Sequence, residues 1–144
     1  MTTKNFVCVC IAGALFCAAL AAFSQQGESF RTRLSPVPIN VAMQSAVAGS
    51  GSVTATLQGN QLTLSGTFEG MRSSATVAHL HRGSRGMSGP RIADLTVTKA
   101  AGGSVSGSLD LAPAQVDDLR NGRVYVQIHS ESAPDGNLRG WLLP

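Results

Sequence analysis

Short segments with a period of two dominate the chain from residue 37 to its end. Val, Thr and Leu alternate with polar or small residues, and Gly, Ser, Asn or Pro separates one segment from the next. Successive side chains of a β-strand point to opposite faces, so this alternation predicts strands with one buried face and one face in water. The pattern is typical of an antiparallel β protein.

The predicted strands are joined by short turns. They fall near residues 39–43, 53–57, 62–68, 75–81, 92–98, 104–111, 123–130 and 137–143. Gly59-Asn60 and Asp135-Gly136 are favourable turn pairs, and a single short helix is predicted over residues 113–121. Because about seven short strands with regular turns are typical of two packed sheets, we expect an all-β fold, an antiparallel Greek-key β-sandwich with one short helix.

The N-terminal segment has a different character. Lys4 precedes an apolar run over residues 6–23, and small residues lie around Ser24. This is the layout of an export signal, and the apolar run is shorter than the about 20 residues of a usual membrane-spanning helix. We therefore expect residues 1–24 to be a cleaved signal peptide, with an uncleaved membrane anchor as the alternative. The mature protein is then periplasmic or secreted, with no further membrane contact.

Cysteine positions and length constrain the mature chain. Cys8, Cys10 and Cys17 all lie inside the predicted signal peptide, so the exported chain has no disulfide and no thiol chemistry. Residues 25–36 show no sustained period and end at a proline, which predicts a flexible leader. Residues 37–144 are enough for one domain with its own core.

Charge and sequence motifs exclude several classes of function. The formal net charge is only +3, and the chain has one Trp and one Tyr. A weak positive charge with scattered arginines does not favour a nucleic-acid partner. The sequence also lacks a nucleophile elbow and a marked carboxylate pair, so we do not expect an enzyme.

The candidate chemistry lies in the three histidines. His79 and His81 belong to one predicted strand, and His129 belongs to another. The first two share a strand face at a separation of about 7 Å. If the two strands are neighbours, three imidazoles form a three-nitrogen metal site with an open position. We expect a transition metal, with copper preferred. The alternative is that the histidines are hydrogen-bonded structural residues and the domain binds another protein.

Four motifs resemble those of the CHRD domain, a family named after chordin. They are Ala-His-Leu-His-Arg-Gly at residues 78–83, Gly-Met-Ser-Gly-Pro at 86–90, Tyr-Val-Gln-Ile-His-Ser at 125–130 and Pro-Asp-Gly-Asn-Leu-Arg-Gly at 134–140. The resemblance covers nearly all of residues 37–144. It implies an extracytoplasmic domain that can bind a protein partner and has no catalytic activity. Asn137 and Trp141 depart from the family pattern, in which Glu and Gln are more frequent.

Two further expectations concern specific residues. The His-x-His strand is also similar to that of copper-zinc superoxide dismutases, but the chain lacks their remaining ligands, so a dismutase is not expected. Arg139 lies in the last predicted strand beside apolar residues. Because a lone buried guanidinium costs several kcal/mol, we expect Arg139 to form a structural ion pair with Asp94 or Glu131.

Overall fold

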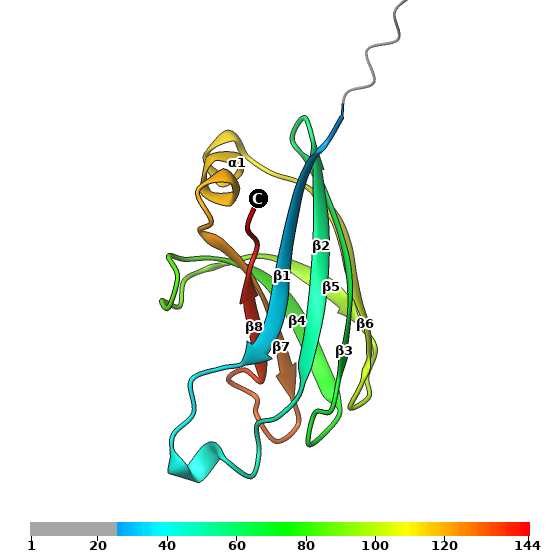
Figure 1. The fold of residues 1–144 in the computed structure, drawn as a ribbon, viewed down its shortest axis with the longest axis vertical. Helices are drawn as coiled ribbons and strands as arrows, with labels where there is room; N and C mark the ends of the chain where they lie inside the picture. Colours follow the sequence, from blue (N-terminus) through cyan, green and yellow to red (C-terminus); the bar gives the residue numbers. More distant parts are fainter. Residues whose placement is uncertain (1–25) are drawn as a thin grey trace, which may run out of the picture.

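Eight antiparallel strands close into a barrel in the computed structural model, which describes residues 26–144 (Figure 1). The strands are β1 (Glu28–Pro36), β2 (Ser50–Gln58), β3 (Gln61–Glu69), β4 (Ala75–Arg82), β5 (Arg91–Val97), β6 (Gly103–Asp110), β7 (Val124–Ser130) and β8 (Leu138–Trp141). Around the barrel their order is β1-β2-β3-β6-β5-β4-β7-β8. The predicted signal peptide, residues 1–24, lies outside the described residues.

Closure of the barrel corrects the predicted sandwich. The all-β class and the antiparallel pairing are confirmed, but the prediction of two Greek-key sheets with about seven strands is wrong. The closing contact joins β1 to β8, with Ser35 opposite Arg139, and an isolated bridge just beyond β8 pairs Arg31 with Leu143. A Cβ atom on Gly140 would lie only 2.6 Å from a carbonyl oxygen of β1. Glycine at this position therefore allows the two strands to approach each other.

The predicted flexible leader is also wrong over most of residues 25–36, because this segment forms β1. Phe30 and Leu34 point into the barrel and are buried, whereas Arg31 and Arg33 are exposed on the outer face. The segment is needed to close the barrel. The folded domain therefore begins near residue 28 and not at residue 37.

The two ends of the barrel carry the helical segments (Figure 1). Helix α1 (Pro113–Arg120) confirms the predicted helix and buries Val116 and Leu119. The 3-10 helix η1 (Val41–Met43) replaces the strand predicted at residues 39–43, and Asn40 caps it by accepting a hydrogen bond from the Met43 amide at 3.2 Å. None of the helices within residues 26–144 has the length and apolar character needed to cross a membrane.

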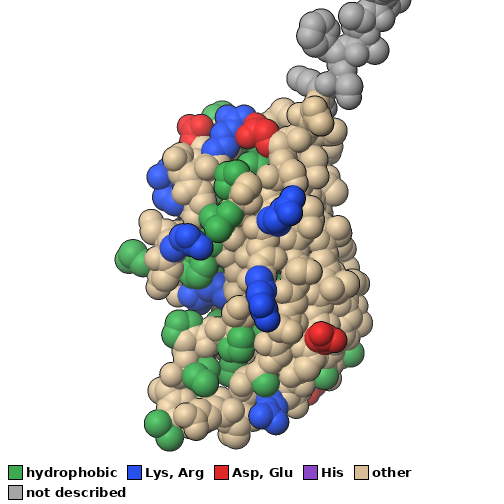
Figure 2. All heavy atoms as spheres, in the orientation of Figure 1, with side chains coloured by type: hydrophobic (Ala, Val, Ile, Leu, Met, Phe, Trp, Pro, Cys, Tyr) green, Lys and Arg blue, Asp and Glu red, His purple; other side chains and the backbone are tan. Residues whose placement is uncertain are grey.

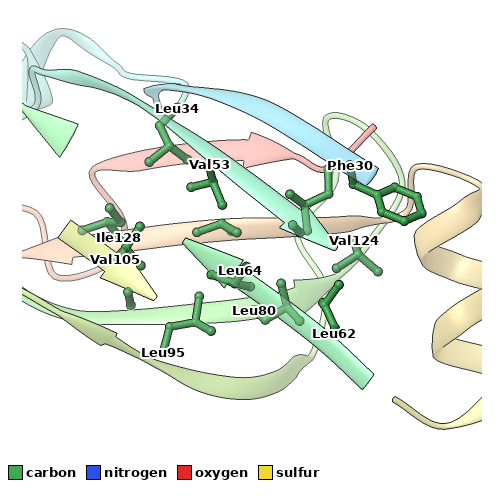
Figure 3. Close-up of a cluster of buried hydrophobic side chains, with 14 of the residues drawn as sticks. Phe30, Leu34, Val53, Leu62, Leu64, Leu80, Leu95, Val105, Val124 and Ile128 are labelled. Atoms are coloured by element: carbon green, nitrogen blue, oxygen red, sulfur yellow. The ribbon is translucent and has the colours of Figure 1, made fainter. Parts of the chain in front are cut away.

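The hydrophobic core fills the barrel (Figure 3). Every strand contributes inward side chains, and those of Leu80 and Ile128 are completely buried. Burying a side chain of this size contributes about 1.5–3 kcal/mol. The alternate side chains of β4 and β7 point outward, so the residues of the candidate site lie outside the core that stabilises the fold.

Candidate metal centre

The three histidines converge on the outer face of β4 and β7. Because Leu80 points into the barrel, its neighbours His79 and His81 point outward. Strand β7 pairs with β4 and places Gln127 opposite His79, and His129 lies next on the same face. One ligand nitrogen from each histidine lies within 4.8 Å of the other two. The neighbouring strands that a three-histidine site requires are thus present.

The imidazole rings are close enough to share one ion. The ring centroid of His79 lies 5.0 Å from that of His129 and 5.7 Å from that of His81. Three nitrogens about 2.0 Å from one tetrahedral ion are about 3.3 Å apart. Small rotations of the side chains would therefore bring all three rings to ligand distance.

His81 has one buried nitrogen without a partner. Its Nδ1 atom lies 3.0 Å from the carbonyl oxygen of Gly89. A carbonyl only accepts, so Nδ1 carries the proton and Nε2 carries a lone pair. This Nε2 atom is buried and has no hydrogen-bond partner within residues 26–144. The ring also stacks on Tyr125, with 4.9 Å between centroids and 5° between planes. The lone pair is therefore available to an electron-pair acceptor such as a metal ion.

Two sets of contacts indicate that His129, like His81, carries its proton on Nδ1. Its Nδ1 atom donates to the carbonyl oxygen of Pro134 at 2.7 Å. Gln127 is oriented by Arg139, whose Nε donates to Oε1 of the amide at 2.7 Å. The amide nitrogen of Gln127 therefore faces the Asp135 carbonyl at 3.1 Å and Nε2 of His129 at 3.3 Å. Because that nitrogen only donates, Nε2 of His129 carries the lone pair.

Electrostatics favour neutral rings at the two β4 histidines. Burial lowers the pKa of His79 and also lowers the pKa of His81, where the hydrogen bond to Gly89 acts in the opposite direction. The carboxylate of Asp94, 3.4 Å from Nε2 of His79, raises the pKa of His79 but does not outweigh burial, and it also pairs with Arg91 at 2.9 Å. Neutral imidazole is the form that binds metals, so these shifts favour metal binding near neutral pH.

A glycine-rich loop between β4 and β5 supplies the carbonyl group that orients His81. The amide of Gly89 donates to the Tyr125 hydroxyl at 3.1 Å, and Nε1 of Trp141 donates to the Gly83 carbonyl at 2.8 Å. These contacts attach the loop to β7 and β8. The Gly89 carbonyl is consequently fixed by neighbouring elements and not by the loop alone.

The family model of the CHRD domain matches residues 30–142, a range that includes both histidine strands and the glycine-rich loop. The chain belongs to the CHRD domain family. The match confirms the resemblance carried by the four motifs, and it starts within β1. The chain has no significant match among curated proteins or solved structures.

Arg139 of the CHRD domain does not form the predicted ion pair. Within residues 26–144, no ion pair involves Arg139, so neither Asp94 nor Glu131 is its partner. Its guanidinium donates to Gln127 and lies 4.9 Å from the ring centroid of Tyr125. A hydrogen bond and an aromatic face replace the carboxylate. Arg139 is thus a positioning residue for the amide next to His129.

Sequence reasoning missed Gln127 as part of this site. The available signal was the alternation in β7, which places Tyr125, Gln127 and His129 on one strand face. All three are buried although they point away from the barrel, because side chains of β4 and β8 and the neighbouring loops cover them. A polar side chain that shares a face with an aromatic residue and a histidine needs hydrogen-bond partners if that face is covered, and this need is the signal for an orienting role.

Replacing Gly89 by alanine is expected to weaken metal binding by about 10–100-fold, the usual cost of losing an orienting hydrogen bond. A Cβ atom at this position would overlap the carbonyl oxygen of Arg82, so the loop must move. Movement breaks the contacts of Gly89 with His81 and Tyr125. Calorimetric titration with Cu(II) measures the change. Ser84→Ala, an exposed substitution in the same loop, is the control, and equal affinities for both variants would contradict the orienting role.

Proposed function

We propose that this CHRD domain is an exported, non-enzymatic module that binds one transition-metal ion, with copper preferred, through His79, His81 and His129. The buried Nε2 atom of His81 carries the proposal. It has no hydrogen-bond partner within residues 26–144, and the ligand nitrogens of the three histidines lie within 4.8 Å of one another. A buried polar atom without a partner costs about 1–3 kcal/mol, and a bound ion would remove that cost.

The donor atoms support copper. Imidazole nitrogen is a ligand for copper and zinc, and among divalent first-row metals Cu(II) forms the most stable complexes with a given nitrogen site. Carbonyl groups hold the Nδ1 protons of His81 and His129. Such contacts fix the ring orientation and raise the basicity of the ligand nitrogen. The side chain of His79 is 16% exposed, which leaves a path for an ion to enter.

Export and the absence of catalysis complete the proposal. The apolar run at residues 6–23 after Lys4 supports export. Membership of the CHRD family supports a binding role, and the three clustered side chains are all imidazoles, a ligand type suited to a transition metal. The partner we propose is therefore the metal ion itself.

Calorimetric titration of residues 26–144, without an affinity tag, tests the proposal. This range contains the whole barrel and its core. We expect one ion per domain, a Kd for Cu(II) at or below about 1 µM, and weaker binding of Zn(II). Electron paramagnetic resonance of the Cu(II) complex should show coupling to imidazole nitrogens. A Kd above about 100 µM for both metals would contradict metal binding and leave protein–protein interaction as the function of the domain.

A further inference from the structure

A second candidate site lies on the outer face of β1 and β8, apart from the three histidines. It is an open groove of about 860 Å³ whose lining includes four arginines and one tryptophan. The arginines are Arg31, Arg33, Arg85 and Arg139, and the tryptophan is Trp141. The volume lies within the range of ligand-binding clefts. No histidine lines this groove, so its ligand need not be a metal.

The groove is lined by arginines that are not paired with Asp or Glu side chains of residues 26–144. Within the described residues, carboxylates pair with Arg82, Arg91, Arg120 and Arg123, but with none of the four groove arginines. No Asp or Glu lines the groove. Figure 2 shows basic side chains across the middle of this face, with acidic side chains toward its margins. Unpaired guanidinium groups in a concave surface attract anions.

The arginines follow the repeat of an extended chain. Arg31 and Arg33 alternate on the outer face of β1, and the next outward residue, Ser35, lies opposite Arg139 of β8. Alternate positions on a strand are about 7 Å apart, so Arg31 and Arg33 present two charges at that step along β1. The guanidinium of Arg139 turns toward Gln127 of β7 and lies to one side of this line. An extended peptide presents its alternate side chains at the same step. The spacing therefore matches acidic residues at every second position of a bound segment.

Other features of the groove also suit a peptide. Trp141 and Leu143 provide apolar surface in the groove. Arg139 is held by hydrogen bonds to Gln127 at 2.7 Å and Ser88 at 3.2 Å, and its guanidinium lies 5.8 Å from the Trp141 ring centroid. A guanidinium that is already oriented loses less freedom on binding a carboxylate.

We propose that this groove binds an extended acidic segment of a partner protein, with carboxylates at alternate positions. Carboxylates at two alternate positions pair with Arg31 and Arg33, Arg139 adds positive charge to one side, and apolar side chains of the segment contact Trp141. Arg85, in the loop between β4 and β5, extends the charge at the side of the groove. This site goes beyond the proposed metal function and does not depend on it.

Fluorescence anisotropy with two synthetic peptides tests the proposal. Both contain the same residues, but one has glutamates at alternate positions and the other has them adjacent. With residues 26–144 at moderate salt, we expect the alternating peptide to bind at least about tenfold more tightly, a difference of about 1.4 kcal/mol. Equal affinities would show that only total charge matters and would overturn the proposal. Tighter binding of inorganic polyphosphate than of the alternating peptide would overturn it in favour of a general polyanion site.

Matched variants locate the binding. Arg31→Gln/Arg33→Gln should raise the Kd of the alternating peptide at least about tenfold, and Arg85→Gln should raise it by a smaller factor. Both arginines of the double variant are exposed, so the barrel should be unaffected. Arg72→Gln removes an exposed arginine outside the groove and should leave the affinity unchanged. An equal loss in Arg72→Gln would show non-specific attraction and contradict the assigned site.

Discussion

The domain with both His79 and His81 replaced by alanine is expected to bind Cu(II) at least about 100-fold more weakly than the unaltered domain, a loss of about 2.7 kcal/mol. The substitutions leave His129 as the only one of the three clustered imidazoles. A single imidazole cannot hold the ion in the three-nitrogen arrangement that favours copper. Calorimetric titration of both proteins gives the two values of Kd directly.

The fold of this double variant should persist, because both rings lie outside the barrel and are only partly buried. Val77→Ala, on the same strand and 45% exposed, is the matched control and should keep full Cu(II) affinity. Retention of tight one-to-one binding by the double variant would place the ion elsewhere. A stability loss of about 1–3 kcal/mol without any metal binding by the unaltered domain would instead make the histidines structural.

The alternation of apolar and polar residues along the chain could predict the positions of strands. Val53, Ala55 and Leu57 alternate with polar residues, and these three side chains are buried in β2. Leu62 and Leu64 do the same in β3, and the turn between the two strands falls at the expected Gly-Asn pair. Period-two alternation reports which side of a strand is buried, and that information is local.

Barrel closure and β1 were not accessible in the same way. A sandwich and a barrel both bury one face of every strand, so the alternation is identical in the two folds. The difference lies in the pairing of β1 with β8, which are at opposite ends of the chain. In β1 the inward residues are Phe30, Thr32 and Leu34. With a threonine between only two apolar residues, the segment did not show a sustained period.

The site was predicted only as far as the histidines themselves. The His-x-His spacing places His79 and His81 on one face, and the strand pairing adds His129. The groups that orient the rings are the carbonyls of Gly89 and Pro134. Every residue has a backbone carbonyl, so the sequence does not indicate which carbonyls accept hydrogen bonds from the histidine rings. Loop paths decide this, and they depend on contacts between distant segments.

Leu80→Ala is expected to destabilise the metal-free domain by about 2–5 kcal/mol, because it removes a large side chain from the interior and leaves a cavity. Leu80 has no exposed surface and lies among the labelled core residues of Figure 3. It is also the residue between His79 and His81. For a domain of this length, a loss of about 3 kcal/mol lowers Tm by roughly 10–15 °C, which circular dichroism can follow on heating.

Comparison of Leu80→Ala with Val77→Ala tests which face of β4 points into the barrel. Val77 points outward and is 45% exposed, so its truncation should change stability by less than about 0.5 kcal/mol. At a temperature where Leu80→Ala remains folded, its Cu(II) affinity should stay within about threefold of the unaltered domain. A larger stability loss in Val77→Ala than in Leu80→Ala would mean that β4 is turned over. His79 and His81 would then face the barrel interior, where no ion could reach them, and the metal site would be excluded together with the strand orientation.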